Sequence, residues 1–295
     1  MNKSGVRLGV IGGSGVYGIE GVKDMKSHRI STPFGDPSDD ILTGSLEGNE
    51  VAFLPRHGRG HRLIPSGINY RANIWALKKL GAEMIISVSA VGSMRENLRP
   101  GDVVLVDQFF DRTKNRESTF FGNGLVGHVA FGQPVCGTLA DALKRACAEN
   151  GVNFHDKGTY VCIEGPQFST FAESCVYRGW GVDVIGMTAL PEAKLAREAE
   201  ICYSLMALVT DYDCWHPAHE AVTVDSVVGQ MKKNVINAKK VLRSAIPAIC
   251  RSDALRDCLC RNALGCAIQT SAEAYDRSYI EKLDLIVGKY LNENR

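Results

Sequence analysis

The sequence predicts a single-domain α/β sandwich, in which helices flank one central β-sheet. Short apolar runs recur along the chain, and amphipathic segments with a helical period lie between them. Such alternation is typical of a sheet covered by helices. No repeat and no linker-like change in composition divides the 295 residues. We therefore expect residues 1–295 to form one domain with a large core.

The predicted strands are seven short runs that are apolar on both faces, as expected for a sheet covered on both sides. They span residues 8–11, 51–54, 84–88, 103–106, 159–163, 182–185 and 202–209. Four amphipathic segments predict helices over residues 69–80, 139–149, 224–246 and 274–291. Gly81, Gly151 and Pro247 follow the first three, and glycine or proline at that place favours a helix end.

Composition excludes several classes of protein. The hydrophobic fraction of 45%, the charged fraction of 23% and the net charge of +1 are ordinary for a globular protein and indicate no nucleic-acid partner. No apolar run is long enough to span a membrane, and the N-terminus does not resemble a signal peptide. We expect a cytoplasmic protein whose ten cysteines are free and mostly buried.

A GxGxxG pattern, with Gly13, Gly15 and Gly18, follows the first predicted strand. A dinucleotide site would need a helix starting at this turn and an acidic residue after a second strand. Residues 19–40 have no helical period and supply no such strand. Two readings stay open: a purely structural turn, or an anion-binding turn to which Ser14 adds a hydroxyl.

Other polar or small residues also follow predicted strands. Arg56 and His57 leave the second strand, where Arg could bind phosphate with its planar fork and His could donate another hydrogen bond. The alternative is a solvated basic loop. Ser89 and Ala90 follow the third strand, and Met187 and Thr188 follow residues 182–185. Small residues there would let a ligand approach the backbone, although an ordinary strand end or core filler explains them too.

Asp211 and Asp213 follow the last strand. On an extended backbone, residues two apart point the same way, so both carboxyl groups would face one side. A purine presenting N7 and a 6-amino group could satisfy them if one carboxyl is protonated. The alternative is a capping pair at a helix start. A metal site is less well supported, because no His or acid lies nearby at a suitable helical spacing.

The order of these motifs resembles the purine nucleoside phosphorylase family, and within it the branch that acts on 5′-methylthioadenosine. The likeness runs from about residue 8 to about residue 247, and residues 251–295 match only weakly. It rests on GVIGGSG, TPFGDPSD, RHGRGHRLIPSGINYRANIWALK, SAVGS, GDVVLVDQFFDRT, IEGPQFST, GMTALPE and TDYDCWHPAHEAVTVDSV. The long motif that begins at Arg56 is the most specific of these. The resemblance implies the nucleoside phosphorylase fold, with a mixed central sheet.

The resemblance also implies roles for individual residues. Phosphate would be bound by Ser14, Arg56, His57, Ser89, Ala90 and Thr188. The nucleoside would contact Met187, Phe168, Ser169, Asp211, Tyr212, Asp213, Val224, Val227, Val228 and, from a neighbouring subunit, His128. Asp211 would be the general acid that protonates N7 of the base. The implied assembly is a homo-oligomer, a trimer or in some members a hexamer.

The base-binding pair implies the substrate. Relatives that act on 6-oxopurines carry Asn where this chain has Asp211, so Asp211 implies a 6-aminopurine. The apolar Val224 and Val227 imply a 5′-methylthio group. The implied reaction cleaves S-methyl-5′-thioadenosine with inorganic phosphate as co-substrate and needs no metal or organic cofactor. The alternatives are a methylthioinosine or 6-oxopurine nucleoside phosphorylase, a hydrolytic nucleosidase, a non-catalytic nucleoside-binding protein and, last, a nicotinamide-dependent dehydrogenase.

Cys258 and Cys260 form a CxC motif. It resembles a motif of heat-stable members of the same branch, where it can be redox-active or accompany disulfides. In a reducing cytoplasm we expect free thiols. No chemistry is assigned to residues 251–295.

Overall fold

The computed structural model describes residues 5–13, 15–16, 18–216 and 224–291. Its described strands form one eleven-stranded mixed sheet. The strands are β1 (Leu8–Gly12), β2 (Lys23–His28), β3 (Ile41–Leu46), β4 (Asn49–Pro55), β5 (Met84–Ser93), β6 (Val103–Val106), β7 (Gln108–Arg112), β8 (Phe154–His155), β9 (Thr159–Ile163), β10 (Val184–Gly186) and β11 (Cys202–Asp211). The main order is β2-β3-β4-β1-β5-β10-β9-β7, and β11 joins β5 to β6, which pairs with β8.

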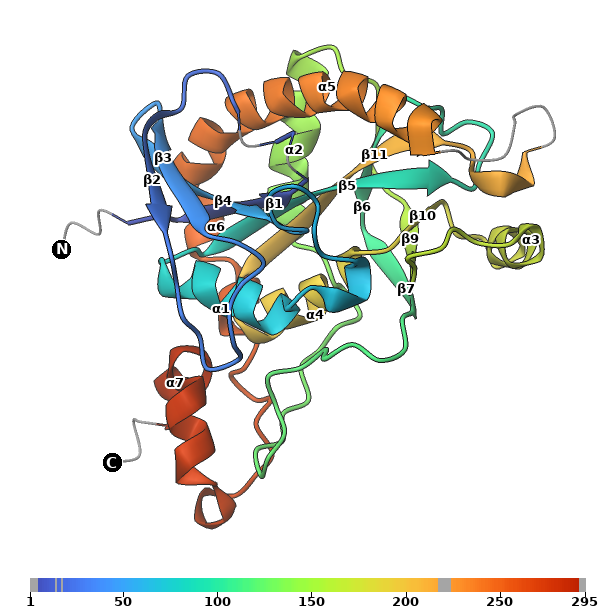
Figure 1. The fold of residues 1–295 in the computed structure, drawn as a ribbon. Coiled ribbons are helices and arrows are strands. Elements are labelled where there is room, and N and C mark those ends of the chain that lie inside the picture. Colours follow the sequence, from blue (N-terminus) through green and yellow to red (C-terminus); the bar gives the residue numbers. More distant parts are fainter. Residues whose placement is uncertain (1–4, 14, 17, 217–223, 292–295) are drawn as a thin grey trace.

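The long helices cover both faces of the sheet. They are α1 (Tyr70–Lys79), α2 (Gly137–Glu149), α3 (Phe171–Gly179), α4 (Ala189–Glu198), α5 (Val224–Arg251) and α7 (Arg277–Leu291), and the short α6 spans Asp253–Arg256. Figure 1 shows α5 and α2 on one face and α1 and α4 on the other, with α7 beyond α1 and α3 projecting past the strand ends. The predicted α/β sandwich is therefore confirmed.

Each helical layer closes its own apolar core against the sheet. Ile74 of α1 and Leu195 of α4 belong to one core cluster, together with Leu283 of α7. Leu143 of α2 and Leu242 of α5 belong to the cluster on the opposite face. Because the central strands contribute side chains to both clusters, they are apolar on both sides.

All seven predicted strands and all four predicted helices have counterparts, but the elements with weak apolar patterns were missed. The sequence Lys23–His28 of β2 is almost wholly exposed and pairs with β3 alone, so no alternation of buried residues marks it. The strands β3, β7 and β8 and the helices α3 and α4 were also missed. α4 begins three residues after β10 ends. The motif GMTALPE therefore covers the end of the strand and the start of the helix, and no separate helical pattern was recognised.

The end of α5 was predicted wrongly. The helix continues through Pro247 to Arg251. Proline removes one helical hydrogen bond, but Ile246 and Ile249 on either side are fully buried in the core. Packing of this helix against the sheet outweighs the local preference of proline to end it. Among the described residues, every helix is too short or too polar to cross a bilayer.

Candidate active site

A cavity of about 890 Å³ lies where several strands end. Its walls include residues just beyond β1, β4 and β10, the ends of β5 and β11, and one side of α5. The strands β4, β1, β5 and β11 are neighbours and run parallel. Their carboxyl ends therefore meet at one edge of the sheet, the usual place for ligands in α/β folds.

Two hydroxyl groups reach this edge: Ser89 lies in β5, and Thr188 follows the antiparallel strand β10. Val184 pairs with Ser93, and Ile185 pairs with Gly92, so the chain leaving β10 runs back along β5. Thr188 Oγ1 consequently lies 3.2 Å from Ser89 Oγ. Two hydroxyl groups that are 99 residues apart in sequence thus converge in the cavity. Hydroxyl groups paired in this way can donate hydrogen bonds to an oxyanion.

Arg56 is fully buried beyond β4, where a carboxylate holds its guanidinium. Nε donates to Glu192 Oε2 at 2.8 Å, and Nη2 donates to Oε1 at 3.1 Å. Nη2 also donates to Ser87 Oγ at 2.6 Å, and Nη1 donates to the Val88 carbonyl at 3.0 Å. With these four contacts to described residues, one of the five N–H groups stays available to a ligand. The sequence predicts that the planar guanidinium of Arg56 binds two oxygens of phosphate. In the structure, Arg56 instead donates two hydrogen bonds to the Glu192 carboxylate.

Glu192 keeps Arg56 charged and fixed. Burial alone would lower the pKa of Arg56, but the Glu192 carboxylate raises it overall. Glu192 Oε1 also accepts hydrogen bonds from Ser87 Oγ at 2.6 Å and from the Tyr203 hydroxyl at 3.0 Å. Sequence analysis missed this role, although Glu192 ends the quoted motif GMTALPE. An acid beside a strand end close to a candidate phosphate site was the available signal.

His57 follows Arg56 in the chain, and its Nδ1–H donates a hydrogen bond to the protein backbone. Nδ1 is 2.8 Å from the Leu63 carbonyl, which can only accept. Burial lowers the pKa of His57 to about 4, so the ring is neutral near pH 7 and leaves Nε2 as an acceptor. Contrary to the prediction of a hydrogen bond donated by His57, the neutral ring suits a phosphate that carries a proton.

The low pKa of His57 makes the fold sensitive to acid. The pKa rises toward its ordinary value of 6.5 on unfolding, so unfolding takes up a proton between about pH 6.5 and pH 4. We expect the free energy of unfolding to fall across this range more steeply in the wild type than in His57→Gln. Urea titrations at several pH values measure it. Equal slopes in the wild type and in His57→Gln would contradict the assignment.

Asp211 and Asp213 line the same cavity. Thr210 Oγ1 donates to Asp211 Oδ2 at 2.6 Å, and the Asp213 backbone N–H donates to Oδ1 at 2.8 Å. Ser174 of α3 donates to Asp213 Oδ2 at 2.5 Å. Burial nevertheless raises the pKa of Asp211 and also that of Asp213. A carboxyl group with a raised pKa in a cavity can act as a general acid.

A turn lies between Asp211 and Asp213, so the prediction that both residues lie on an extended backbone is wrong. The register of β11 against β5 shifts between Val209 and Asp211, and Asp213 has a left-handed backbone with φ +52°. Gly92 makes room for this turn, because a Cβ there would lie 3.0 Å from Asp211 Oδ1. A bulge beside a site commonly redirects a side chain in this way.

Comparison with known proteins assigns the family. A family model described as the phosphorylase superfamily matches residues 7–247. The chain belongs to the phosphorylase superfamily. Its relatives include the S-methyl-5′-thioadenosine phosphorylase of Koribacter versatilis, 57% identical over 98% of both chains. The enzyme of the same name from Geobacter sulfurreducens is 55% identical over 96% of this chain and 99% of the relative.

Solved structures in the superfamily share the fold. A methylthioadenosine phosphorylase from an antarctic soil metagenomic library superposes with a TM-score of 0.91 at 49% identity, covering 96% of this chain and 99% of that one. The relatives' alignments extend over nearly the whole chain, whereas the superfamily model ends at residue 247. The weakly matched region 251–295 thus has counterparts in close relatives.

Most of the residues predicted for a phosphorylase site lie together. The cavity is lined by Arg56, His57, Ser89, Ala90, Phe168, Ser169, Met187, Thr188, Asp211, Asp213 and Val228. Two predicted residues are not among those that line it: Tyr212, whose hydroxyl lies 3.4 Å from the Glu96 carbonyl, and the exposed His128. Ser14 and the side chains of Val224 and Val227 lie outside the described residues.

The glycine turn of this superfamily member does not form a dinucleotide site. Gly13 and Gly15 line the cavity, and β1 is followed by the exposed strand β2, with no helix among the described residues between them. Lys239 of α5 reaches the turn, since its Nζ would be 3.4 Å from a Cβ at Gly18. Because Lys239 also lines the cavity, it adds positive charge that sequence analysis missed.

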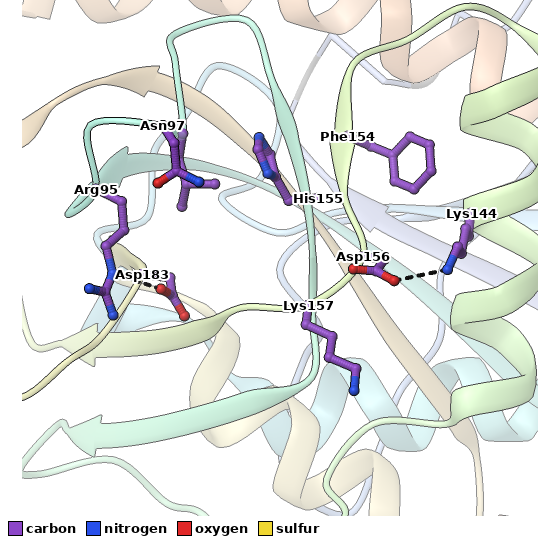
Figure 2. A pocket seen from close by; sticks show the side chains of 9 residues that line it. Arg95, Asn97, Lys144, Phe154, His155, Asp156, Lys157 and Asp183 are labelled. Atoms are coloured by element: carbon purple, nitrogen blue, oxygen red, sulfur yellow. Dashed lines mark hydrogen bonds and ion pairs between the residues drawn. The ribbon is translucent and has the colours of Figure 1, made fainter.

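A second cavity, of about 580 Å³, has a different character. In Figure 2, Arg95 lies beside Asp183 at the left of this cavity, and Lys144 lies beside Asp156 at the right. The two ion pairs measure 2.9 and 2.8 Å. None of the predicted site residues that the structure describes lines this cavity.

Proposed function

We propose that this protein converts S-methyl-5′-thioadenosine and inorganic phosphate to adenine and 5-methylthioribose 1-phosphate. One observation carries the proposal: a single cavity is lined both by hydroxyl and guanidinium donors and by two carboxyl groups with raised pKa values. The donors suit phosphate, and the carboxyl groups suit a 6-aminopurine. The curated relatives at 55–57% identity have the corresponding name.

The proposed reaction breaks the bond between N9 of adenine and C1′ of the sugar. The electron pair of this bond goes to the base while protonated Asp211 gives its proton to N7. The sugar develops positive charge at C1′, which the phosphate anion stabilises before an oxygen of phosphate bonds to that carbon. Ser89, Thr188 and the remaining N–H of Arg56 would hold the phosphate. No organic cofactor or metal enters this scheme.

Other cavity residues support binding of the nucleoside. Ser169 Oγ is buried with no hydrogen-bond partner among the described residues, so it is available to a polar ligand atom. The wall formed by α5 is largely apolar, with Val228, Met231, Val235 and Ile236. An apolar wall suits a 5′-methylthio group and discriminates against a hydroxyl by about 1–3 kcal/mol.

Product analysis tests the proposed function. The protein is mixed with methylthioadenosine, with and without phosphate, and the products are separated by chromatography and identified by mass. We expect adenine and 5-methylthioribose 1-phosphate only when phosphate is present. Adenine release without phosphate would indicate hydrolysis, and faster turnover of methylthioinosine would indicate a 6-oxopurine enzyme. Absence of turnover with all these nucleosides would leave a binding protein.

We propose further that the protein is a homo-oligomer, with the trimer as the expected form. Phe168, Phe171, Val176 and Trp180 are 48–64% exposed on and beside α3. So many apolar side chains around one short helix favour a covered surface, and Phe168 also lines the cavity. A neighbouring subunit could bring its exposed His128 to that opening. Light scattering after gel filtration measures the mass. The cytoplasmic location and a role in purine and methionine salvage stay predictions.

A further inference from the structure

Four cysteine side chains converge outside the cavity. Cys136 precedes α2, Cys202 begins β11, and Cys258 and Cys260 lie in the C-terminal region. Their four Sγ atoms all lie within 4.8 Å of one another, and the Cys136 and Cys258 sulfurs are 3.6 Å apart. We call these four residues the cysteine cluster. Sequence analysis expected free thiols here and did not foresee that they would meet.

The cysteine cluster is remote from the proposed chemistry. Cys202 and Asp211 are the first and last residues of β11, so about 30 Å of extended chain separates the cluster from the cavity. Cys136 and Cys202 are buried, and Cys258 and Cys260 are half-buried. The proposed reaction therefore gives these thiols no role, and their convergence needs a separate explanation.

The arrangement fits a metal ion better than two disulfides. Two disulfides need only two close pairs of sulfurs, whereas here all six pairs are close. A central zinc with Zn–S bonds of about 2.3 Å requires sulfurs about 3.8 Å apart at the corners of a tetrahedron. The sulfur separations in the cluster are compatible with that tetrahedron. Four sulfur ligands are typical of zinc or iron, and hard cations such as Mg²⁺ prefer oxygen.

We propose that Cys136, Cys202, Cys258 and Cys260 bind one Zn²⁺ ion in a closed tetrahedral site. The thiols would lose their protons as the metal binds. Because the protein supplies all four ligands, no position stays open for water or substrate, and the role is structural. The ion would join α2 and β11, which belong to the core, to the C-terminal region that lies beyond the superfamily match at residue 247.

Metal analysis of the full-length protein tests this proposal. The protein is produced without a metal-binding tag in medium containing zinc, purified under reducing conditions and analysed by plasma mass spectrometry. We expect about one zinc per chain, and a melting temperature roughly 5–10 °C lower after the metal is removed by a chelator. Replacement with Co²⁺ should give the absorption bands of a tetrahedral thiolate site. These measurements do not depend on enzymatic activity, so they stand apart from the proposed phosphorolysis.

A matched pair of variants locates the site. Cys260→Ser should lower the zinc content at least tenfold, since one of four ligands is lost. Cys266→Ser changes an exposed cysteine of the same region that lies outside the cysteine cluster, and it should keep the full zinc content. Should Cys260→Ser fail to fold, the zinc content and cobalt spectrum of the wild type still decide.

Three results would overturn the proposal. The first is a wild-type protein, grown and dialysed with zinc, that carries none. The second is a mass that shows disulfides among these cysteines in protein purified without reductant and still binding no zinc. The third is iron in place of zinc.

Discussion

Asp211→Asn lowers kcat/KM for methylthioadenosine by about 10²–10⁴-fold, the range expected when a general acid is lost. Asparagine keeps the shape and can still accept the hydrogen bond from the Asp213 N–H, which measures 2.8 Å in the wild type. It cannot give a proton to N7. Burial raises the pKa of Asp211, so wild-type kcat should fall as the pH rises through that raised pKa, and the variant should lack this decline.

Substrate preference gives a second readout for the same variant. An amide suits a 6-oxopurine with a proton on N7, so Asp211→Asn should shift the ratio of kcat/KM values toward methylthioinosine. Steady-state assays with both nucleosides measure this ratio. Asp156→Asn is the matched control, because Asp156 lines the second cavity and pairs with Lys144; it should change neither value. Full activity of Asp211→Asn on methylthioadenosine would exclude Asp211 as the acid.

Arg56→Ala raises KM for phosphate by roughly 10- to 150-fold and also destabilises the fold. The phosphate loses a charged donor, and charged hydrogen bonds contribute about 1.5–3 kcal/mol each. In addition, Glu192 stays behind as a buried carboxylate without its ion-pair partner. Leaving one partner of a buried pair in this way costs about 3–5 kcal/mol. Initial rates at varied phosphate and a thermal melt measure the two effects.

Two further variants separate phosphate binding from folding. Arg56→Lys keeps a positive charge beside Glu192 but loses the planar fork, so its melting temperature should lie between those of the wild type and Arg56→Ala while KM for phosphate stays high. Arg59→Ala is the control on the same loop. Arg59 is 61% exposed and pairs with Asp39 at 2.8 Å, and surface pairs contribute little. A wild-type phosphate KM in Arg56→Ala would refute the phosphate site.

Short sequence motifs predict many of the residues that line the cavity. Polar or small residues directly after apolar runs mark strand ends, and the superfamily match agrees with the resemblance seen in those motifs. Eleven of the predicted residues do line one cavity. Tyr212 and Glu192 show the limit of such inference. Their neighbours in sequence identify a site, but the direction of each side chain depends on the backbone turn in which it lies.

The sequence by itself determined the seven most apolar strands, four of the helices and the loops that carry polar chemistry, because hydrophobic period and turn residues are properties of a few consecutive positions. Only the tertiary structure decided the partners. Arg56 meets Glu192 across 136 residues, and Cys136 meets Cys258 across 122. Such contacts depend on strand order and register, which result from packing of the whole chain, and no local pattern encodes them.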